Sequence, residues 1–227
     1  MALAEALNIL SKTCLLCEDF GEKVSHLDHS LQTYTYLKKM YPGDTELAVA
    51  GFWHDIGHCF CTLDDDEHYP LMVKYDGEGV QVLGVEDHDR LGSELFQGVL
   101  PDRVCELINL HTIAKRYANQ VNNTADRLSE ASAATLILEG GDLSAQERLE
   151  FELNPLFTDA MKLREGDDAG KNPKFEHTDM DGNMLIGGRD AEIFSALRDT
   201  MVLHSRQRVE PALNAPRGGA APQIDTR

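Results

Sequence analysis

Apolar residues recur at intervals of three or four along most of this chain, and that spacing restricts the fold more than any other feature. One face of an α-helix repeats with this period. The clearest stretch is closed by the helix breakers Pro42-Gly43 and consists of Leu27, Leu31, Tyr34, Leu37 and Tyr41. No alternating run rich in Val, Ile and Thr is long enough to indicate a sheet. The sequence therefore predicts an all-α helical bundle.

The same spacing, together with helix-capping and helix-breaking residues, predicts the order of the remaining helices. One begins at Asp44 or Thr45 and leads into the sequence His54-Asp55. Between this helix and the next, residues 62–86 are rich in Asp and Gly and predict a long irregular loop, with a small hairpin near 75–85. We expect one domain over 1–208 and a flexible tail over 209–227. Further helices are expected near 87–98, 101–117, 129–138, 144–152, 156–164 and 190–206.

Length and charge limit the classes of partner. A chain of 227 residues suits one compact domain, and its net charge of −18 disfavours nucleic acid and anionic membranes. Apolar runs such as 47–53 are far shorter than the roughly 20 residues that span a bilayer, and no signal pattern opens the sequence. The five cysteines are an odd number and are expected to be reduced. We therefore expect a cytoplasmic protein that binds a small molecule; the oligomeric state stays open.

A set of histidines and aspartates predicts a metal site. The adjacent pair His54-Asp55 is weak evidence alone, but other candidates lie on separate predicted helices: His29, His88, His111, and Asp167 after the helix that ends at Arg164. Four imidazoles and two carboxylates can saturate two metals if one carboxylate bridges, and Asp55 is the natural bridge. Such ligands suit iron, manganese or zinc. His58, four residues after His54, is expected to orient a ligand, whereas His26 is expected to be an ordinary surface or core residue.

The order of these residues resembles the HD superfamily, in which two additional histidines mark the branch with two metals. More narrowly, the chain resembles the mixed-valent di-iron phosphonate oxygenases, over about 22–171. The stretches that carry this resemblance are Glu22 seven residues before His29, HTIAKRY at 111–117, LSEASAATLILEGG at 128–141, and Arg164 followed by Asp167 and Lys171.

The resemblance implies a reaction and roles for individual residues. It implies two iron ions in the Fe(II)/Fe(III) state, dioxygen as co-substrate, and a small organophosphonate whose carbon–phosphorus bond is cleaved. The phosphonate would be bound by Lys115, one helical turn beyond His111, by Arg164 and by Ser132. Glu22 and His58 would take part in catalysis.

Two departures from this family bear on the substrate. Relatives that act on aminoethylphosphonates carry a tyrosine where this chain has Asp19, and a glutamine where it has Glu139. Together with Glu22, these carboxylates would favour a quaternary ammonium tail. The preferred substrate is therefore 1-hydroxy-2-(trimethylammonio)ethylphosphonate, giving glycine betaine and phosphate. The alternative is the primary amine, giving glycine.

Three rival interpretations remain open at this stage. An HD phosphohydrolase would use a metal-bound hydroxide and need no oxygen. A signalling domain without catalysis would have no need of six metal ligands. The inositol oxygenase branch shares the metal set but not the sequence around Lys115 and Arg164.

Overall fold

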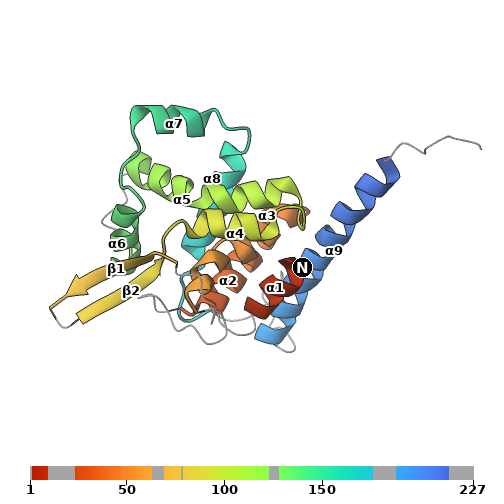
Figure 1. Ribbon diagram of the computed structural model, residues 1–227, viewed down its shortest axis with the longest axis horizontal. Helices are drawn as coiled ribbons and strands as arrows, with labels where there is room; N and C mark the ends of the chain where they lie inside the picture. Colours follow the sequence, from red (N-terminus) through yellow and green to blue (C-terminus); the bar gives the residue numbers. More distant parts are fainter. Residues whose placement is uncertain are drawn as a thin grey trace, which may run out of the picture.

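The structure is a computed structural model that describes residues 2–9, 24–62, 69–77, 79–122, 128–175 and 188–214. Within these ranges it consists of helices and one two-stranded sheet, so the all-α prediction is confirmed (Figure 1). In chain order the elements are α1 (Ala2–Ile9), α2 (His26–Met40), α3 (Thr45–Trp53), the 3-10 helix η2 (Ile56–Thr62), β1 (Leu71–Asp76), β2 (Gly79–Val85), α4 (His88–Phe96), α5 (Asp102–Asn122), α6 (Glu130–Leu138), α7 (Ala145–Glu152), α8 (Phe157–Ala169) and α9 (Arg189–Asn214).

The expected helices are all present, with three differences. Helix α1 was not predicted. Helix α8 continues to Ala169, so Asp167 lies within this helix; its expected position after a helix ending at Arg164 is wrong. The helix continues through Gly166, where a Cβ atom would lie 2.8 Å from Cγ of Leu37, and its C-cap is Gly170. Helix α9 continues to Asn214, past the predicted start of the tail, and the division into domain and tail stays a prediction.

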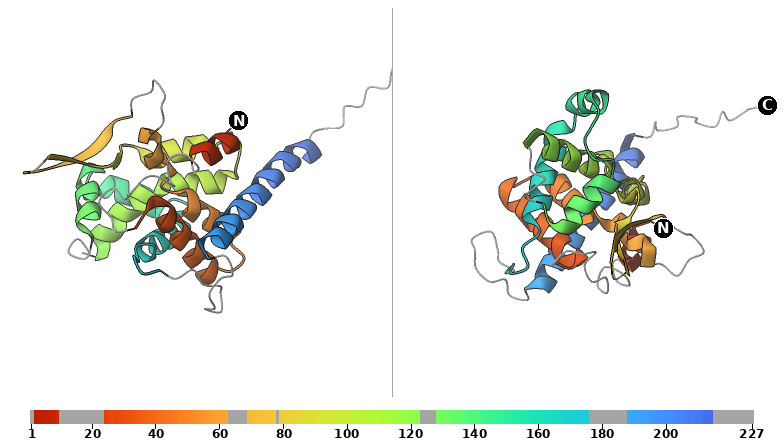
Figure 2. Two further views of the ribbon diagram at one scale, coloured as in Figure 1. Left: turned by 90° about the horizontal axis from the view of Figure 1, so that it is seen from below. Right: turned by 90° about the vertical axis from the view of Figure 1, so that its left-hand side faces the viewer.

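The main core lies where α2, α3, α5 and α8 pack together, with α4 against α5. Trp53, Phe52 and Phe96 are fully buried and make edge or tilted ring contacts with one another. Burial of side chains this large contributes about 1.5–3 kcal/mol each. Helix α9 packs on α2 and α3, where the Trp53 ring nitrogen donates to Thr200, and its C-terminal half extends away from the bundle (Figure 2).

The His-Asp pair lies where α3 gives way to η2. Helix α3 ends at Trp53, and His54 is its C-cap. The next turn must approach α4 closely: a Cβ atom on Gly57 would lie 2.0 Å from the carbonyl oxygen of His88. Glycine is therefore required there, and it brings the segment after Asp55 against the start of α4.

The predicted hairpin is confirmed, and it begins earlier than expected, at Leu71. Strands β1 and β2 are antiparallel, with Leu71 opposite Val85 and Asp76 opposite Gly79. Figure 1 shows the hairpin projecting from the bundle beside α6. Met72 and Leu83 pack with Ala131 of α6 in a small apolar cluster separate from the main core. The hairpin and α6 therefore form a unit at the side of the bundle, named here the α6–hairpin wall because it lines the cavity described below.

Two expectations about the protein's environment can be compared with the structure. Among the described residues, no helix is long and apolar enough to cross a membrane. Cys105 is free and buried, as expected, but Cys59 is disulfide-bonded. The expectation of reduced cysteines is therefore wrong for Cys59.

Candidate metal centre and adjoining cavity

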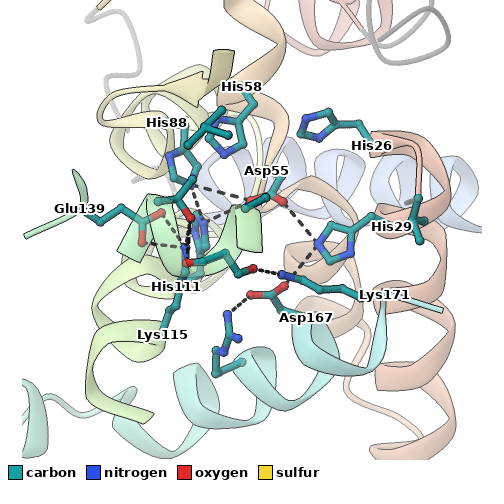
Figure 3. A pocket seen from close by; sticks show the side chains of 16 residues that line it. His26, His29, Asp55, His58, His88, His111, Lys115, Glu139, Asp167 and Lys171 are labelled. Atoms are coloured by element: carbon teal, nitrogen blue, oxygen red, sulfur yellow. Dashed lines mark hydrogen bonds and ion pairs between the residues drawn. The ribbon is translucent and has the colours of Figure 1, made fainter. Parts of the chain in front are cut away.

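The predicted ligands lie together in two groups, and Figure 3 shows five of the six, all except His54. Each group has three side chains whose ligand atoms lie within 4.8 Å of one another. Either group can hold a metal ion. The first group is His29 of α2, His54 and Asp167 of α8; the second is Asp55, His88 of α4 and His111 of α5.

Asp55 lies between the two groups with one oxygen toward each. Its Oδ2 is 3.3 Å from the Nε2 atoms of both His29 and His54. Its Oδ1 is 3.3 Å from Nε2 of His111 and 3.8 Å from Nε2 of His88. This placement is the one that a bridging carboxylate needs.

Backbone carbonyls orient three of the four imidazoles. Nδ1 of His29 donates to the Gly170 carbonyl at 3.0 Å, and Nδ1 of His54 donates to Gly51 at 2.8 Å. Nδ1 of His111 donates to Ile108 at 2.6 Å. A carbonyl only accepts, so each Nδ1 carries a hydrogen and each Nε2 points into the cluster, where it can give its lone pair to a metal ion. This tautomer is the one that binds metals, and the residues present therefore fit a pair of metal ions.

The local charges also favour a bound cation. Burial disfavours the charged form of His29, but Asp167 and Asp55 outweigh it and raise the pKa of His29 to about 10. Burial also disfavours the charged form of His111, but the hydrogen bond and the charge of Asp55 outweigh it and raise the pKa of His111 to about 9. Burial would raise the pKa of Asp55, yet the surrounding imidazoles hold it well below its usual value. The carboxylates therefore hold positive charge tightly within the cluster, whether as protons or as metal ions.

His58 lies against the second ligand group. Its ring stacks on that of His88, with centroids 3.6 Å apart and planes at 21°. The backbone N–H of Val85 donates to its Nδ1 at 3.0 Å. Burial holds the pKa of His58 well below its usual value, so the ring is neutral and Nε2 carries its hydrogen. This position agrees with the expected role beside a ligand, which stays a prediction.

His26 is a cavity residue that the sequence analysis missed. It was expected to be an ordinary histidine, yet it lines the cavity, with its ring centroid 5.6 Å from that of His58. Burial lowers the pKa of His26 to about 4. The available signal was its spacing, because three residues before His29 on the same helix is the same helix face.

A cavity adjoins the two ligand groups and is lined on its other side by the α6–hairpin wall. On that side the cavity is lined by Leu83 of β2 and by the α6 residues Ala131, Ser132 and Thr135. The body of the bundle contributes the cationic side chains Lys115, Arg164 and Lys171. The cavity thus combines a metal-binding floor with positive charge, an arrangement that suits an anionic ligand.

The structure places Lys115 at the cavity as expected but gives Glu139 a different partner. Nζ of Lys115 donates to Thr135 at 2.7 Å and lies 2.9 and 2.8 Å from the two carboxylate oxygens of Glu139. Glu139 lines the cavity, and its carboxylate is ion-paired with Lys115; that it faces the tail of a substrate stays a prediction. The other two residues expected there, Asp19 and Glu22, lie outside the described residues.

Arg164 and Ser132 line the cavity as expected, but each already has a protein partner. Nη1 of Arg164 donates to Asp167 at 2.5 Å, and its other nitrogens bind Asp168. The hydroxyl of Ser132 accepts from Nζ of Lys171 at 2.6 Å. Arg164 thus fixes a candidate metal ligand, and the sequence analysis, which expected only a phosphonate partner, missed this contact.

Lys171 and Thr135 complete the cavity and were not among the predicted site residues. Both residues lie in the stretches that carry the family resemblance, and their spacing from predicted site residues could have identified them. Lys171 follows Asp167 by four residues, and Thr135 follows Ser132 by three. Residues three or four positions apart lie on the same face of a helix, so Lys171 lies near Asp167 and Thr135 near Ser132.

A bundle in which a His-Asp pair joins ligands from neighbouring helices defines the chain as an HD-domain metalloprotein. No protein-family model matches it. It is 30% identical over 169 residues to the [1-hydroxy-2-(trimethylamino)ethyl]phosphonate dioxygenase (glycine-betaine-forming) of Leisingera caerulea, covering 71% of this chain and 76% of the relative. It is 32% identical over 153 residues to the hydroxymethylphosphonate dioxygenase of Gimesia maris, covering 67% and 70%. The chain therefore belongs to the HD-domain phosphonate dioxygenase family and is an oxygenase.

Proposed function

We propose that this protein cleaves the carbon–phosphorus bond of a 1-hydroxyalkylphosphonate with dioxygen, giving phosphate and a carboxylate. The observation that carries the proposal is the joining of two ligand groups by Asp55 beside a cavity that holds three cationic side chains. A phosphohydrolase would also use metals, but the relatives named above are dioxygenases. A carbon–phosphorus bond has no ester oxygen for a hydroxide to displace.

The proposed cofactor is a pair of iron ions in the Fe(II)/Fe(III) state. His29, His54 and Asp167 would hold one ion, His88 and His111 the other, and Asp55 would bridge them. When bound, the iron pair supplies the redox chemistry by which dioxygen oxidises C1 of the substrate. The fixed tautomers of the histidines keep their Nε2 lone pairs directed at the metals before substrate arrives.

The remaining cavity residues would bind and orient the substrate. Lys115 and Lys171 neutralise the phosphonate, and the Ser132 hydroxyl adds a hydrogen bond. Arg164 adds positive charge while it holds Asp167 in place. His58 is neutral with its hydrogen on Nε2, so it can donate to a substrate oxygen. Glu22 is proposed to contribute to catalysis.

Within this class we propose 1-hydroxy-2-(trimethylammonio)ethylphosphonate as the substrate and glycine betaine as the product. The name of the Leisingera caerulea relative supports this choice, as do the acidic residues Asp19 and Glu22 of the sequence. The primary amine is the alternative. Hydroxymethylphosphonate is a second candidate, because the Gimesia maris relative is named for it.

The test is an aerobic incubation of iron-reconstituted protein with these three hydroxylated phosphonates, followed by measurement of phosphate and of the carboxylate product. We expect phosphate and glycine betaine in equal amounts from the trimethylammonio compound. A strong preference for another of the three would change the substrate but keep the reaction. Failure to release phosphate from any of them would overturn the proposed function.

A further inference from the structure

One face of α6 supplies the partners of two cavity lysines. Ser132, Thr135 and Glu139 are spaced by three and four residues and therefore lie on the same side of this helix. Ser132 accepts from Lys171, whereas Thr135 and Glu139 both accept from Lys115. Helix α6 thus sets where these two positive charges lie relative to the ligand groups.

The Lys115–Glu139 pair differs from an ordinary surface ion pair. The side chains of Lys115 and Glu139 are only 10% and 7% exposed, and both line the cavity. Nζ of Lys115 is within 2.9 Å of both carboxylate oxygens. A buried pair is screened little by solvent, so Glu139 offsets much of the positive charge that Lys115 presents to an anion.

The backbone around Glu139 fixes the carboxylate in this position. Glu139 is the C-cap of α6 and is followed by Gly140 and Gly141, with φ values of 109° and 63°. Nε of Arg116 donates to the Gly141 carbonyl at 2.9 Å. A Cβ atom on Gly140 would lie 3.2 Å from that guanidinium, so glycine suits both the backbone angle and the contact. The turn after α6 is therefore anchored to α5.

From these contacts we infer that Glu139 is a positioning and specificity-determining residue. It holds Nζ of Lys115 at the cavity wall and lowers the net positive charge there, so that the cavity discriminates against phosphonates that lack a cationic group. The carboxylate of Glu139 attracts the ammonium tail of a cationic substrate and repels its phosphonate, so the two effects offset each other. A phosphonate without a cationic group is only repelled. This inference rests on the proposed function for its substrates.

Glu139→Gln keeps a hydrogen-bond acceptor for Lys115 and removes the charge. The first measurement is binding of methylphosphonate, which has no hydroxyl to oxidise, to metal-loaded protein by calorimetry. We expect the variant to bind it roughly tenfold more tightly. The second measurement is the ratio of kcat/KM for hydroxymethylphosphonate to that for the trimethylammonio compound. This ratio should rise by a similar factor, mainly through KM.

Two further variants separate positioning from a structural effect. Glu130→Gln is the matched control, because Glu130 also pairs with a lysine, Lys74, but is largely exposed at the far end of α6. We expect it to leave both measurements unchanged. Glu139→Asp keeps the negative charge, so it should keep part of the preference of the unmodified protein for the trimethylammonio compound over hydroxymethylphosphonate.

An unchanged methylphosphonate affinity and an unchanged substrate ratio in Glu139→Gln would overturn the inference. So would equal shifts in Glu130→Gln. The proposed function fails separately, if unmodified protein releases no phosphate from any hydroxylated phosphonate. In that case the methylphosphonate measurement alone still decides whether Glu139 controls anion binding.

Discussion

The two sides of the cavity are built in different ways. The ligand side comes from α2, α4, α5 and α8 and from the turn after α3. Its four histidines are buried, and backbone carbonyls hold three of them. The α6–hairpin wall has a small apolar cluster of its own and reaches the body through ion pairs and hydrogen bonds of Lys115 and Lys171. The ligand side therefore belongs to the main core, whereas the contacts of α6 with Lys115 and Lys171 are ion pairs and hydrogen bonds.

This difference separates chemistry from substrate choice. A ligand that moves by a fraction of an ångström alters metal coordination, so the ligand side must be part of the main core. The wall faces the substrate and depends on a few polar contacts, which single substitutions can change without disturbing that core.

The largest effect is expected for Asp55→Ala. Because Asp55 contacts both ligand groups, its removal damages both coordination spheres at once. Reconstituted protein should bind about two irons per chain, and the variant should lose most of both and more than about 100-fold in turnover. Metal analysis after anaerobic reconstitution measures this. Asp142→Ala, at an exposed carboxylate, is the control. One tightly bound metal that survives Asp55→Ala would contradict the bridging role.

Lys115→Ala and Arg164→Ala distinguish the wall from the ligand side. Lys115 contacts the wall, so its loss should weaken kcat/KM by about 1.5–3 kcal/mol while the metal content stays near normal. Arg164 holds Asp167, so its loss should also lower the metal content. Arg148→Ala, which removes an exposed ion pair, should change neither. Normal metal content in Arg164→Ala would show that Arg164 does not support the ligand side.

Trp53→Ala and Leu83→Ala compare the stability of the main core with that of the wall. Trp53 is fully buried, so its truncation should lower the free energy of unfolding by about 3–5 kcal/mol. Leu83 lies in the small cluster, and its truncation should cost about 2 kcal/mol. Urea unfolding after metal removal measures both without a contribution from metal binding. Equal losses would show that the wall is part of the main core.

The smallest effect concerns the pH dependence at Asp44. Its hydrogen bonds to Arg103 lower the pKa of Asp44 in the folded protein. A lowered pKa contributes stability that is present above the unfolded value of 3.8 and lost as the pH falls through the folded value. Asp44→Asn keeps an N-cap acceptor and removes the charge, so it should cost about 0.5–1 kcal/mol at pH 7. The difference should vanish near pH 2 in urea unfolding, and a difference that persists there would exclude this cause.

The sequence predicted the ligand side better than the wall. Helical spacing and the breakers Pro42-Gly43 place the helices, and a helix fixes the direction of a side chain such as His111. The position of Asp167 was wrong only in its helix boundary, because α8 continues through Gly166, which packs on Leu37, to its C-cap at Gly170. Boundaries depend on packing as well as on local signals.

The wall could not be predicted in the same way, because its contacts join segments far apart in the chain. The pairing of Lys115 with Glu139 depends on how the turn at Gly140 and Gly141 lies against Arg116. Nothing local in the sequence specifies which carboxylate a lysine will meet. The sequence therefore identified Glu139 as a cavity residue but did not predict its pairing with Lys115.

The most direct measurement is the stoichiometry of dioxygen and phosphate with the iron-reconstituted protein. Incubation with 1-hydroxy-2-(trimethylammonio)ethylphosphonate should consume one dioxygen for each phosphate released, and release should stop under argon, because oxidation of C1 requires dioxygen. Release of phosphate under argon, or from ordinary phosphomonoesters at a comparable rate, would contradict the oxygenase reaction and indicate a hydrolase.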